Sequence, residues 1–497
     1  MFYWILAVCA LLIRLFFAPY TSFGIDESYM IDRFSWGSEF PLSNGSEVYK
    51  WSLRPGLLIS LVLGIPLKFV QAKSLWGVWI MAILGWLTAL LTFKIYSDLL
   101  KNELTKRIVF VAILFAPWPI IFNSLWHASF TPLSGVLFFL SLKALTNPDS
   151  VSNSNGRFNL GSSGIFASFI LCFQIGLYFL PLALVYSLLV WTKRISPPML
   201  KDFLIPLLLA AATLGPFYLW GPNLSLIPEN HPRYLETQTT PHPHSIFERN
   251  PELVKNNKNF SALVSVHPEN FLQLPKVIYR FLSFATFETS RFLGPGFKST
   301  WKTLVNNSWL IPFILVSWLP SLVLGIATAL YFYFSKKRFY FVFQTLFLRP
   351  NENVRKLTFE EVLEICSFSL PFIFTAAFLF SFKGPSAHTF WLIWPLAFFP
   401  FIKIWSSKLE KLRQLMGPLR LGVSLGFLFF SALLGSLYGH AVNPRTCTLQ
   451  GVRSAAAKND LSLACPMGDP EARLRAFDVI RRELFDANEN RTSLNSK

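Results

Sequence analysis

Long runs of apolar residues alternate with short polar segments along most of this chain. A helix that crosses a bilayer needs about 20 apolar residues, and only helices and closed barrels satisfy every backbone polar group in hydrocarbon. Barrel strands alternate apolar and polar positions, whereas these runs are continuous and rich in Leu and Phe. The pattern predicts an all-α polytopic membrane protein with spans at 2–20, 75–97, 107–122, 131–146, 161–176, 177–192, 202–220, 308–334, 361–381, 388–405 and 418–438.

Three parts of this pattern need interpretation. The first run, 2–20, lacks the basic start and small-residue cleavage site of a signal peptide, so we expect a retained helix. The stretch 161–192 is either two helices or one long helix, and Gln174 and Gly176 near its centre favour two. The short apolar runs at 55–70 and 269–287 suggest helices that lie in the membrane interface.

Basic residues set the orientation. With the N-terminus inside, the inner loops are 101–107, 147–160, 193–201, 336–360 and 403–420. Four of these five loops, all except 147–160, are rich in Lys and Arg, in agreement with the positive-inside rule. The net charge of +18 then reflects attraction to anionic lipid headgroups, since no nucleic-acid-binding module is recognisable. The outer segments are mainly 21–74, 221–307 and 441–497.

Composition supports this division of the chain. Of its 497 residues, 53% are hydrophobic and only 14% are charged, against about 25% charged in a soluble domain. We therefore expect a transmembrane domain over 1–440, of about 11 helices, with two large outer loops at 21–74 and 221–307. The tail at 441–497 carries charges at helical spacing, which predicts a solvated helix packed on the outer loops.

Cys447 and Cys465 both fall in the outer tail. An oxidising compartment allows such a pair to form a disulfide. The alternative is two unpaired thiols in an inner tail, which requires the reverse topology. The sequence thus links the disulfide to the orientation.

The acidic pair Asp26 and Glu27 follows the first span closely, in FGIDESYMIDRF. Two adjacent carboxylates near hydrocarbon are costly unless they are solvated, paired or bound to a cation, and their repulsion raises one pKa toward neutrality. Such a group could act as a general base. The alternative is structural, with Asp26 capping a helix that begins at Glu27.

Several short motifs resemble the membrane-embedded glycosyltransferases of the GT-C class. They are the Arg14-containing first span, the Asp26-Glu27-Ser-Tyr29 segment, Trp51 to Leu57 (WSLRPGL) and 382–395 (FKGPSAHTFWLIWP). The nearest likeness is to glycosyltransferase family 39, the protein O-mannosyltransferases, and to the bacterial aminoarabinose transferase of lipid A. This chain has Arg54-Pro-Gly where those proteins often have His-Pro-Pro or Lys-Pro-Pro. The loop at 221–307 and the tail lie outside the resemblance.

The resemblance implies a GT-C-like bundle in a bacterial inner membrane, with a cytoplasmic N-terminus, a periplasmic C-terminus and periplasmic interfacial helices. It implies a polyprenyl-phosphate sugar donor and an acceptor hydroxyl on a lipid, glycan or protein. Asp26 takes the place of the catalytic base, with Glu27 beside it, and a single base with direct displacement implies inversion. Cations that would hold the donor phosphate are Arg54, Lys383, His388 and Lys50, and supporting residues are Arg14, Tyr29 and Arg33.

No cofactor is implied with certainty. The carboxylate pair could bind a divalent metal, but no metal-ligand spacing is present and we assign no metal site. The alternative function is a transporter or flippase of a lipid-linked or anionic solute. Such a protein should show paired repeats and charges in mid-span, and neither is prominent here. The sequence therefore favours an enzyme.

Overall fold

The computed structural model describes the structure of part of the chain. The described residues are 1–24, 27–28, 30–31, 58–115, 125, 127–146, 159–175, 179–215, 305, 308, 311–347, 356–377, 387–428, 430, 447–465 and 470–495. Over these residues the chain is mostly helical and contains no strand, apart from one isolated antiparallel bridge between Ser22 and Thr448. The predicted all-α architecture is thereby confirmed for the described part of the chain.

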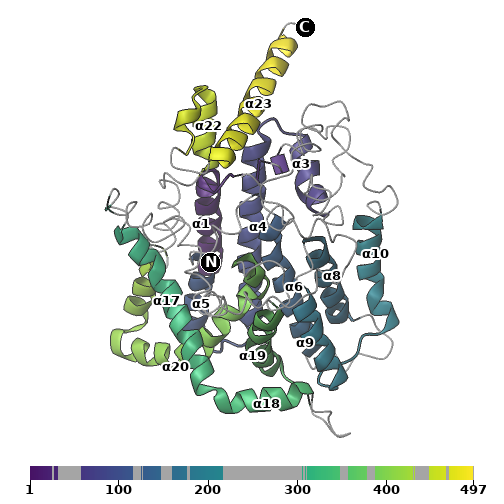
Figure 1. Cartoon of the computed structure of the whole chain (residues 1–497). Helices are drawn as coiled ribbons and strands as arrows, with labels where there is room; N and C mark the ends of the chain where they lie inside the picture. The colour runs from purple at the N-terminus through teal and green to yellow at the C-terminus, as the bar shows by residue number, and fades with distance from the viewer. Residues whose placement is uncertain are drawn as a thin grey trace.

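A bundle of roughly aligned helices forms the body of the molecule, and α22 and α23 stand above one end of it (Figure 1). The α-helices are α1 (Phe2–Phe17), α3 (Ile65–Lys68), α4 (Lys73–Tyr96), α5 (Glu103–Phe115), α6 (Thr131–Thr146), α8 (Leu160–Ile175), α9 (Leu180–Trp191), α10 (Leu204–Thr213), α17 (Ile311–Phe334), α18 (Lys336–Phe347), α19 (Phe359–Ala377), α20 (Phe398–Met416), α22 (Leu449–Ala457) and α23 (Pro470–Asn495). Short helical pieces are η1 (Ala18–Tyr20), η2 (Ser60–Gly64), η4 (His127–Phe130), η5 (Leu200–Phe203), η10 (Ala387–Ala397) and η11 (Leu461–Leu463).

Helices α1 and α4 run antiparallel. The indole N–H of Trp79 donates to the carbonyl of Leu15 at 3.2 Å, and that of Trp86 donates to the carbonyl of Ala7 at 2.8 Å. The two bonds satisfy polar groups of otherwise apolar helices, which matters most where water is excluded. They fix both the direction and the register of this pair.

Small residues allow helix α6 to pack very closely against its neighbours. A Cβ on Gly164 of α8 would lie 2.1 Å from the Ser141 hydroxyl oxygen of α6. A Cβ on Gly135 of α6 would lie 1.8 Å from the backbone oxygen of Leu392 in η10. Close backbone approach through small residues is typical of helices that associate without a hydrophobic driving force.

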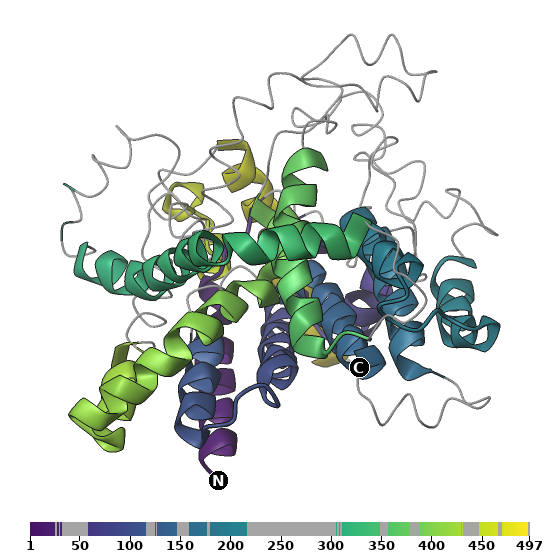
Figure 2. The same ribbon diagram turned by 90° about the horizontal axis from the view of Figure 1, so that it is seen from below.

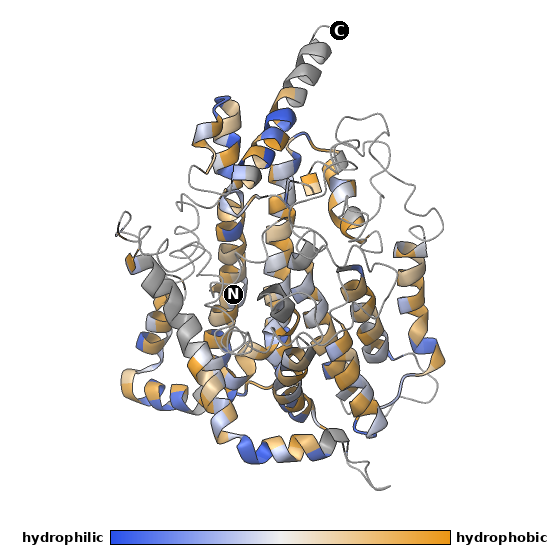
Figure 3. Ribbon diagram, viewed as in Figure 1, coloured by the Kyte–Doolittle hydropathy of each residue, from blue (hydrophilic) through white to orange (hydrophobic). Residues whose placement is uncertain are grey.

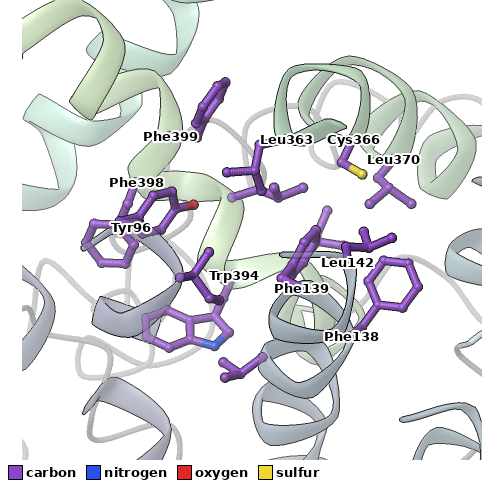
Figure 4. Close-up of a cluster of buried hydrophobic side chains, with 14 of the residues drawn as sticks. Tyr96, Phe138, Phe139, Leu142, Leu363, Cys366, Leu370, Trp394, Phe398 and Phe399 are labelled. Atoms are coloured by element: carbon purple, nitrogen blue, oxygen red, sulfur yellow. The ribbon is translucent and has the colours of Figure 1, made fainter. Parts of the chain in front are cut away.

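The main hydrophobic core lies where α4, α6, α19 and η10 meet (Figure 4). Aromatic side chains fill it, including Phe138, Phe139 and Trp394, which are fully buried. The hydroxyl of Tyr96 donates to the carbonyl of Pro395, so the phenol has a polar partner inside this core. Hydrophobic residues predominate along the helices around it (Figure 3).

Side-chain contacts sort the helix ends into two groups. At the end that we call the tail end, Gln174 at the end of α8 binds Leu58 N–H and Thr213 Oγ1, and Ser74 at the start of α4 binds Glu483 of α23. At the opposite end, four side-chain contacts join helix ends: Tyr3 with Glu103, Lys143 with Lys94, Lys143 with Asp98, and Asn159 with Asp202. A backbone bond from Leu357 to Arg194 lies at the same end. Among the helices from α1 to α10, successive long helices therefore alternate in direction.

The helices fall close to the predicted spans. The span 131–146 coincides with α6. The stretch 161–192 forms two helices, α8 and α9. The two helices pack side by side, with the ring centroids of Phe166 and Tyr186 5.9 Å apart. The apolar run at 55–70 is helical over its described part. The run at 269–287 lies outside the described residues.

Two predicted inner loops are partly helical. Residues 336–347 form α18, and α20 continues through 403–416 instead of ending at 405. Their mixed charged and aromatic sequences hid the helices from the hydrophobic pattern. Arg338 pairs with Glu364, and Lys403 pairs with Glu360, so charges at both elements are partnered by α19.

Among the described residues, two stretches are long and apolar enough to cross a membrane, Phe2–Tyr20 and Lys73–Tyr96. Other apolar helical stretches in the described ranges are shorter: Thr131–Thr146, Leu160–Gln174, Leu180–Trp191, Gly325–Phe334, Trp391–Ile404 and Pro418–Leu428. The total of about 11 spans therefore stays a prediction.

Candidate functional site

The segment that leaves α1 is held by the C-terminal tail. Phe23 N–H donates to the carbonyl of Cys447 at 2.6 Å, and Leu449 N–H donates to the carbonyl of Thr21 at 3.2 Å. These bonds flank the bridge between Ser22 and Thr448. The chain that leads toward Asp26 and Glu27 is thus fixed by its backbone to a segment from the far end of the sequence.

The tail is itself cross-linked and capped. Cys447 and Cys465 form a disulfide, the pair for which the sequence predicts a bond. Thr448 caps α22 by accepting the N–H of Gly451 at 3.1 Å. A threonine at this position satisfies a backbone donor that the helix leaves open. The disulfide, the bridge and the cap thus meet at two adjacent residues of the tail, Cys447 and Thr448.

A buried ionic network joins the tail to α4. The Glu483 carboxylate accepts bonds from Arg453 Nη1 at 2.7 Å, from Ser74 N–H at 2.9 Å and from Ser74 Oγ at 2.8 Å. The Glu483 side chain is 5% exposed. A carboxylate at a helix N-terminus also interacts favourably with the helix dipole. The network fixes α22 and α23 on the start of α4, at the tail end (Figure 1).

A second hydrophobic core surrounds these polar contacts. It is formed by residues from the α1 exit, the 58–68 helix, the upper part of α4 and the tail. Phe23, Ile31, Leu63 and Ile480 are fully buried in it. The charged tail helix therefore packs on the segment that follows α1 and on the 58–68 helix, and the tail is part of the surroundings of Phe23 and Ile31.

Glu27 and Ser28 are helical, and the backbone of Gly24 contacts both residues. The Gly24 carbonyl accepts the N–H of Ser28 at 3.1 Å, and the Gly24 N–H donates to Glu27 Oε2 at 2.9 Å. This is the acidic half of a capping box, in which the side chain returns to the N-cap backbone. Glu27 is 8% exposed. The Glu27 carboxylate thus accepts a backbone N–H, whereas the alternative in which Asp26 caps a helix falls on a residue outside the described part of the chain.

Arg14 is buried in the bundle, as the sequence suggests. It is 1% exposed, and Nη2 donates to the carbonyl of Leu114 at the end of α5 at 3.2 Å. Its Nε and Nη1 atoms have no hydrogen-bond partner within the described part of the chain. A buried guanidinium with open donors is suited to an anionic group.

Most of the remaining predicted site residues fall outside the described part of the chain. Asp26, Tyr29, Arg33, Lys50, Arg54 and Lys383 lie outside the described residues. His388 falls in η10, where the backbone is described. No group of metal-ligating side chains occurs in the ranges that the structure describes. The described part of the site is thus Arg14, Glu27 and the tail contacts.

Sequence reasoning missed Arg453, Glu483 and Ser74. Arg453 and Glu483 lie in a charged pattern that is typical of a solvated helix, and Ser74 is a polar residue before a span. Only their three-dimensional contact distinguishes them. The cysteine pair is the one signal in the sequence that marks this region.

Comparison of the chain with protein-family models, with curated proteins and with solved structures finds no match.

Proposed function

We propose that this protein is a polytopic membrane glycosyltransferase. It transfers a sugar from a polyprenyl-phosphate donor to an acceptor hydroxyl at the outer face of a bacterial inner membrane. The tail end of the bundle is then the outer end, and the opposite end faces the cytoplasm. The resemblance of the first loop and late motif to GT-C enzymes supports the reaction class, and the alternating helices support the membrane arrangement.

One observation carries the proposal. A carboxylate, Glu27, is buried directly after a membrane-length apolar helix, and its turn is held from both sides, by Gly24 and by the tail. Glu27 is the described member of the acidic pair. A held turn beside Asp26 is what a general base at that position requires.

In the proposed reaction the acceptor oxygen attacks the anomeric carbon of the donor. The bond from this carbon to the phosphate oxygen breaks, and the lipid phosphate leaves with the electron pair. The acceptor proton passes to the Asp26 carboxylate, and the configuration at the anomeric carbon inverts. Arg54, Lys383, His388 and Lys50 are the proposed partners of the leaving phosphate, and the buried Arg14 supports the site from within the bundle.

The roles of the two acids differ in this proposal. Glu27 uses one carboxylate oxygen on Gly24 N–H, so it is a positioning residue for the turn, and Asp26 is the base. Gln in place of Glu27 can still accept the Gly24 bond, whereas Ala cannot. Glu27→Gln should therefore keep more activity than Glu27→Ala.

The test is sugar transfer by the full chain reconstituted in liposomes. The donors are radiolabelled polyprenyl phosphates carrying mannose or aminoarabinose, as suggested by the resemblance. Asp26→Asn should reduce transfer by about 10²–10⁴-fold while leaving the unfolding temperature unchanged, because loss of a general base removes a factor of this size. Full activity of Asp26→Asn would overturn the assignment. Movement of the donor between leaflets without release of polyprenyl phosphate would indicate a flippase.

A further inference from the structure

Helix α18 carries cations and aromatic rings side by side on one exposed side. Lys336, Lys337, Tyr340 and Phe343 are all exposed, and we call this set the α18 face. Tyr340 is 65% exposed. At 100° per residue the other three lie within about 60° of Tyr340 around the helix axis. Transfer of exposed aromatic rings out of water is favourable, and lysines attract anions. The face is therefore suited to surroundings that are partly apolar and partly anionic.

The direction of α18 differs from that of the bundle. The chain turns at Ser335, where the Ser335 carbonyl accepts the N–H groups of Arg338 and Phe339. From there α18 runs across the end of the bundle opposite α22 and α23 (Figure 1). Seen from below, α17 and α18 lie across this end (Figure 2). A helix in this position is parallel to the surface of a membrane that the bundle crosses.

Contacts with α19 fix which side of α18 turns outward. Val342 is buried, and Arg338 Nη1 pairs with Glu364 Oε1 at 2.7 Å. Arg338 and Val342 are four residues apart and therefore share one side of the helix. Tyr340, midway between them in sequence, points to the opposite side. Since α18 is attached to the bundle through Arg338 and Val342, the α18 face turns away from the molecule.

We propose that the α18 face binds the anionic phospholipid surface of the inner leaflet. Aromatic rings favour the boundary between headgroups and acyl chains, and lysines beside them favour phosphate groups. Helix α18 carries both hydrophilic and hydrophobic residues (Figure 3), as a helix at a membrane interface does. The inference rests on the membrane orientation in the proposed function, but not on sugar transfer.

The test measures the depth of a spin label on α18. The free cysteines Cys9, Cys172 and Cys366 are replaced by Ala, the tail disulfide is kept, and Tyr340→Cys carries a nitroxide. The full chain is placed in nanodiscs of phosphatidylcholine with or without phosphatidylglycerol. With the anionic lipid, the label should be several-fold more accessible to oxygen than to a water-soluble nickel chelate. A label at Lys458→Cys on the tail is the aqueous control.

The lysines are tested in the same background. Lys336→Gln with Lys337→Gln should move the label toward water in anionic nanodiscs, because each lysine strengthens binding about fivefold near such a surface. Lys458→Gln should change nothing. The inference is overturned if the Tyr340→Cys label is as accessible to the nickel chelate as the control label in both lipids. It is also overturned if the depth of the label is the same with and without the two lysines. Neither result affects sugar transfer, whose loss in Asp26→Asn is measured separately.

Discussion

The backbone N–H of Phe23 donates a hydrogen bond to the carbonyl of Cys447 at 2.6 Å. Phe23 is fully buried, three residues before Asp26, and Cys447 is one half of the tail disulfide. The position of the first loop at the end of α1 is therefore coupled to the covalent state of the tail. This coupling makes the tail a structural requirement for the proposed site.

Loss of the disulfide should loosen the tail. Cys447 and Cys465 are separated by 18 positions, and a bridge of this span stabilises a fold by about 3 kcal/mol in the chain-entropy model. We expect Cys447→Ser with Cys465→Ser to unfold at lower temperature and to release the tail to protease. Cys9→Ser, at an exposed free cysteine, is the control. Equal melting and equal proteolysis of the two variants would contradict the prediction.

Removal of one partner of the buried ion pair should be more harmful than removal of an exposed one. Glu483→Gln leaves Arg453 without a counter-charge, and because the Arg453 side chain is 19% exposed the cost should lie below the about 3–5 kcal/mol of a fully buried pair. The Glu103–Arg107 pair is 56% and 48% exposed and should contribute less than about 1 kcal/mol. Denaturant titration of Glu483→Gln and Glu103→Gln in detergent measures the difference. Similar midpoints for the two variants would show that the tail network is not stabilising.

Addition of a methyl group at Gly135 should disrupt helix packing. The new Cβ would lie 1.8 Å from the Leu392 backbone oxygen, so α6 and η10 must separate. Overpacking of this kind costs about 1–3 kcal/mol or more. A Cβ on Gly422 would meet no neighbouring atom of the described chain within 4 Å, so Gly422→Ala should be neutral or slightly stabilising. Thermal unfolding of the two alanine variants gives the comparison, and equal midpoints would exclude a tight contact at Gly135.

The ion pair at the opposite end should respond to acid. A hydrogen bond from Lys143 at 2.8 Å lowers the pKa of Asp98 below its usual 3.8. A carboxyl with a lowered pKa stabilises the folded state above its usual pKa, and this contribution is lost as pH falls through the lowered value. Because Asp98 is 75% exposed, we expect at most about 1 kcal/mol.

The measurement compares unfolding of the wild type and Asp98→Asn from neutral pH to about pH 3. The difference in stability should be largest near neutral pH and should shrink toward zero in acid. A difference that grows in acid would have the wrong sign for a lowered pKa.

Hydrophobic periodicity located most helices but few of the contacts that matter for the site. The boundaries of α6 could be predicted because polar segments flank a continuous apolar run. The partnership of Ser74 with Glu483 could not, because it depends on how the tail folds back over α4. The cap at Gly24 and Glu27 is local and could have been predicted from a spacing of three residues. Helix α18 was hidden because three cations begin it and the apolar run that follows them is too short to predict a span.

The bridge between Ser22 and Thr448 has a consequence for biogenesis. Ser22 is synthesised early, whereas Thr448 follows only after all the bundle helices have been made. During this time the Phe23 N–H and the Thr21 carbonyl lack their native partners. A contact between such distant positions forms late in folding, since the intervening chain must first be ordered. Translation of the tail is therefore the step that completes the structure around the acidic pair.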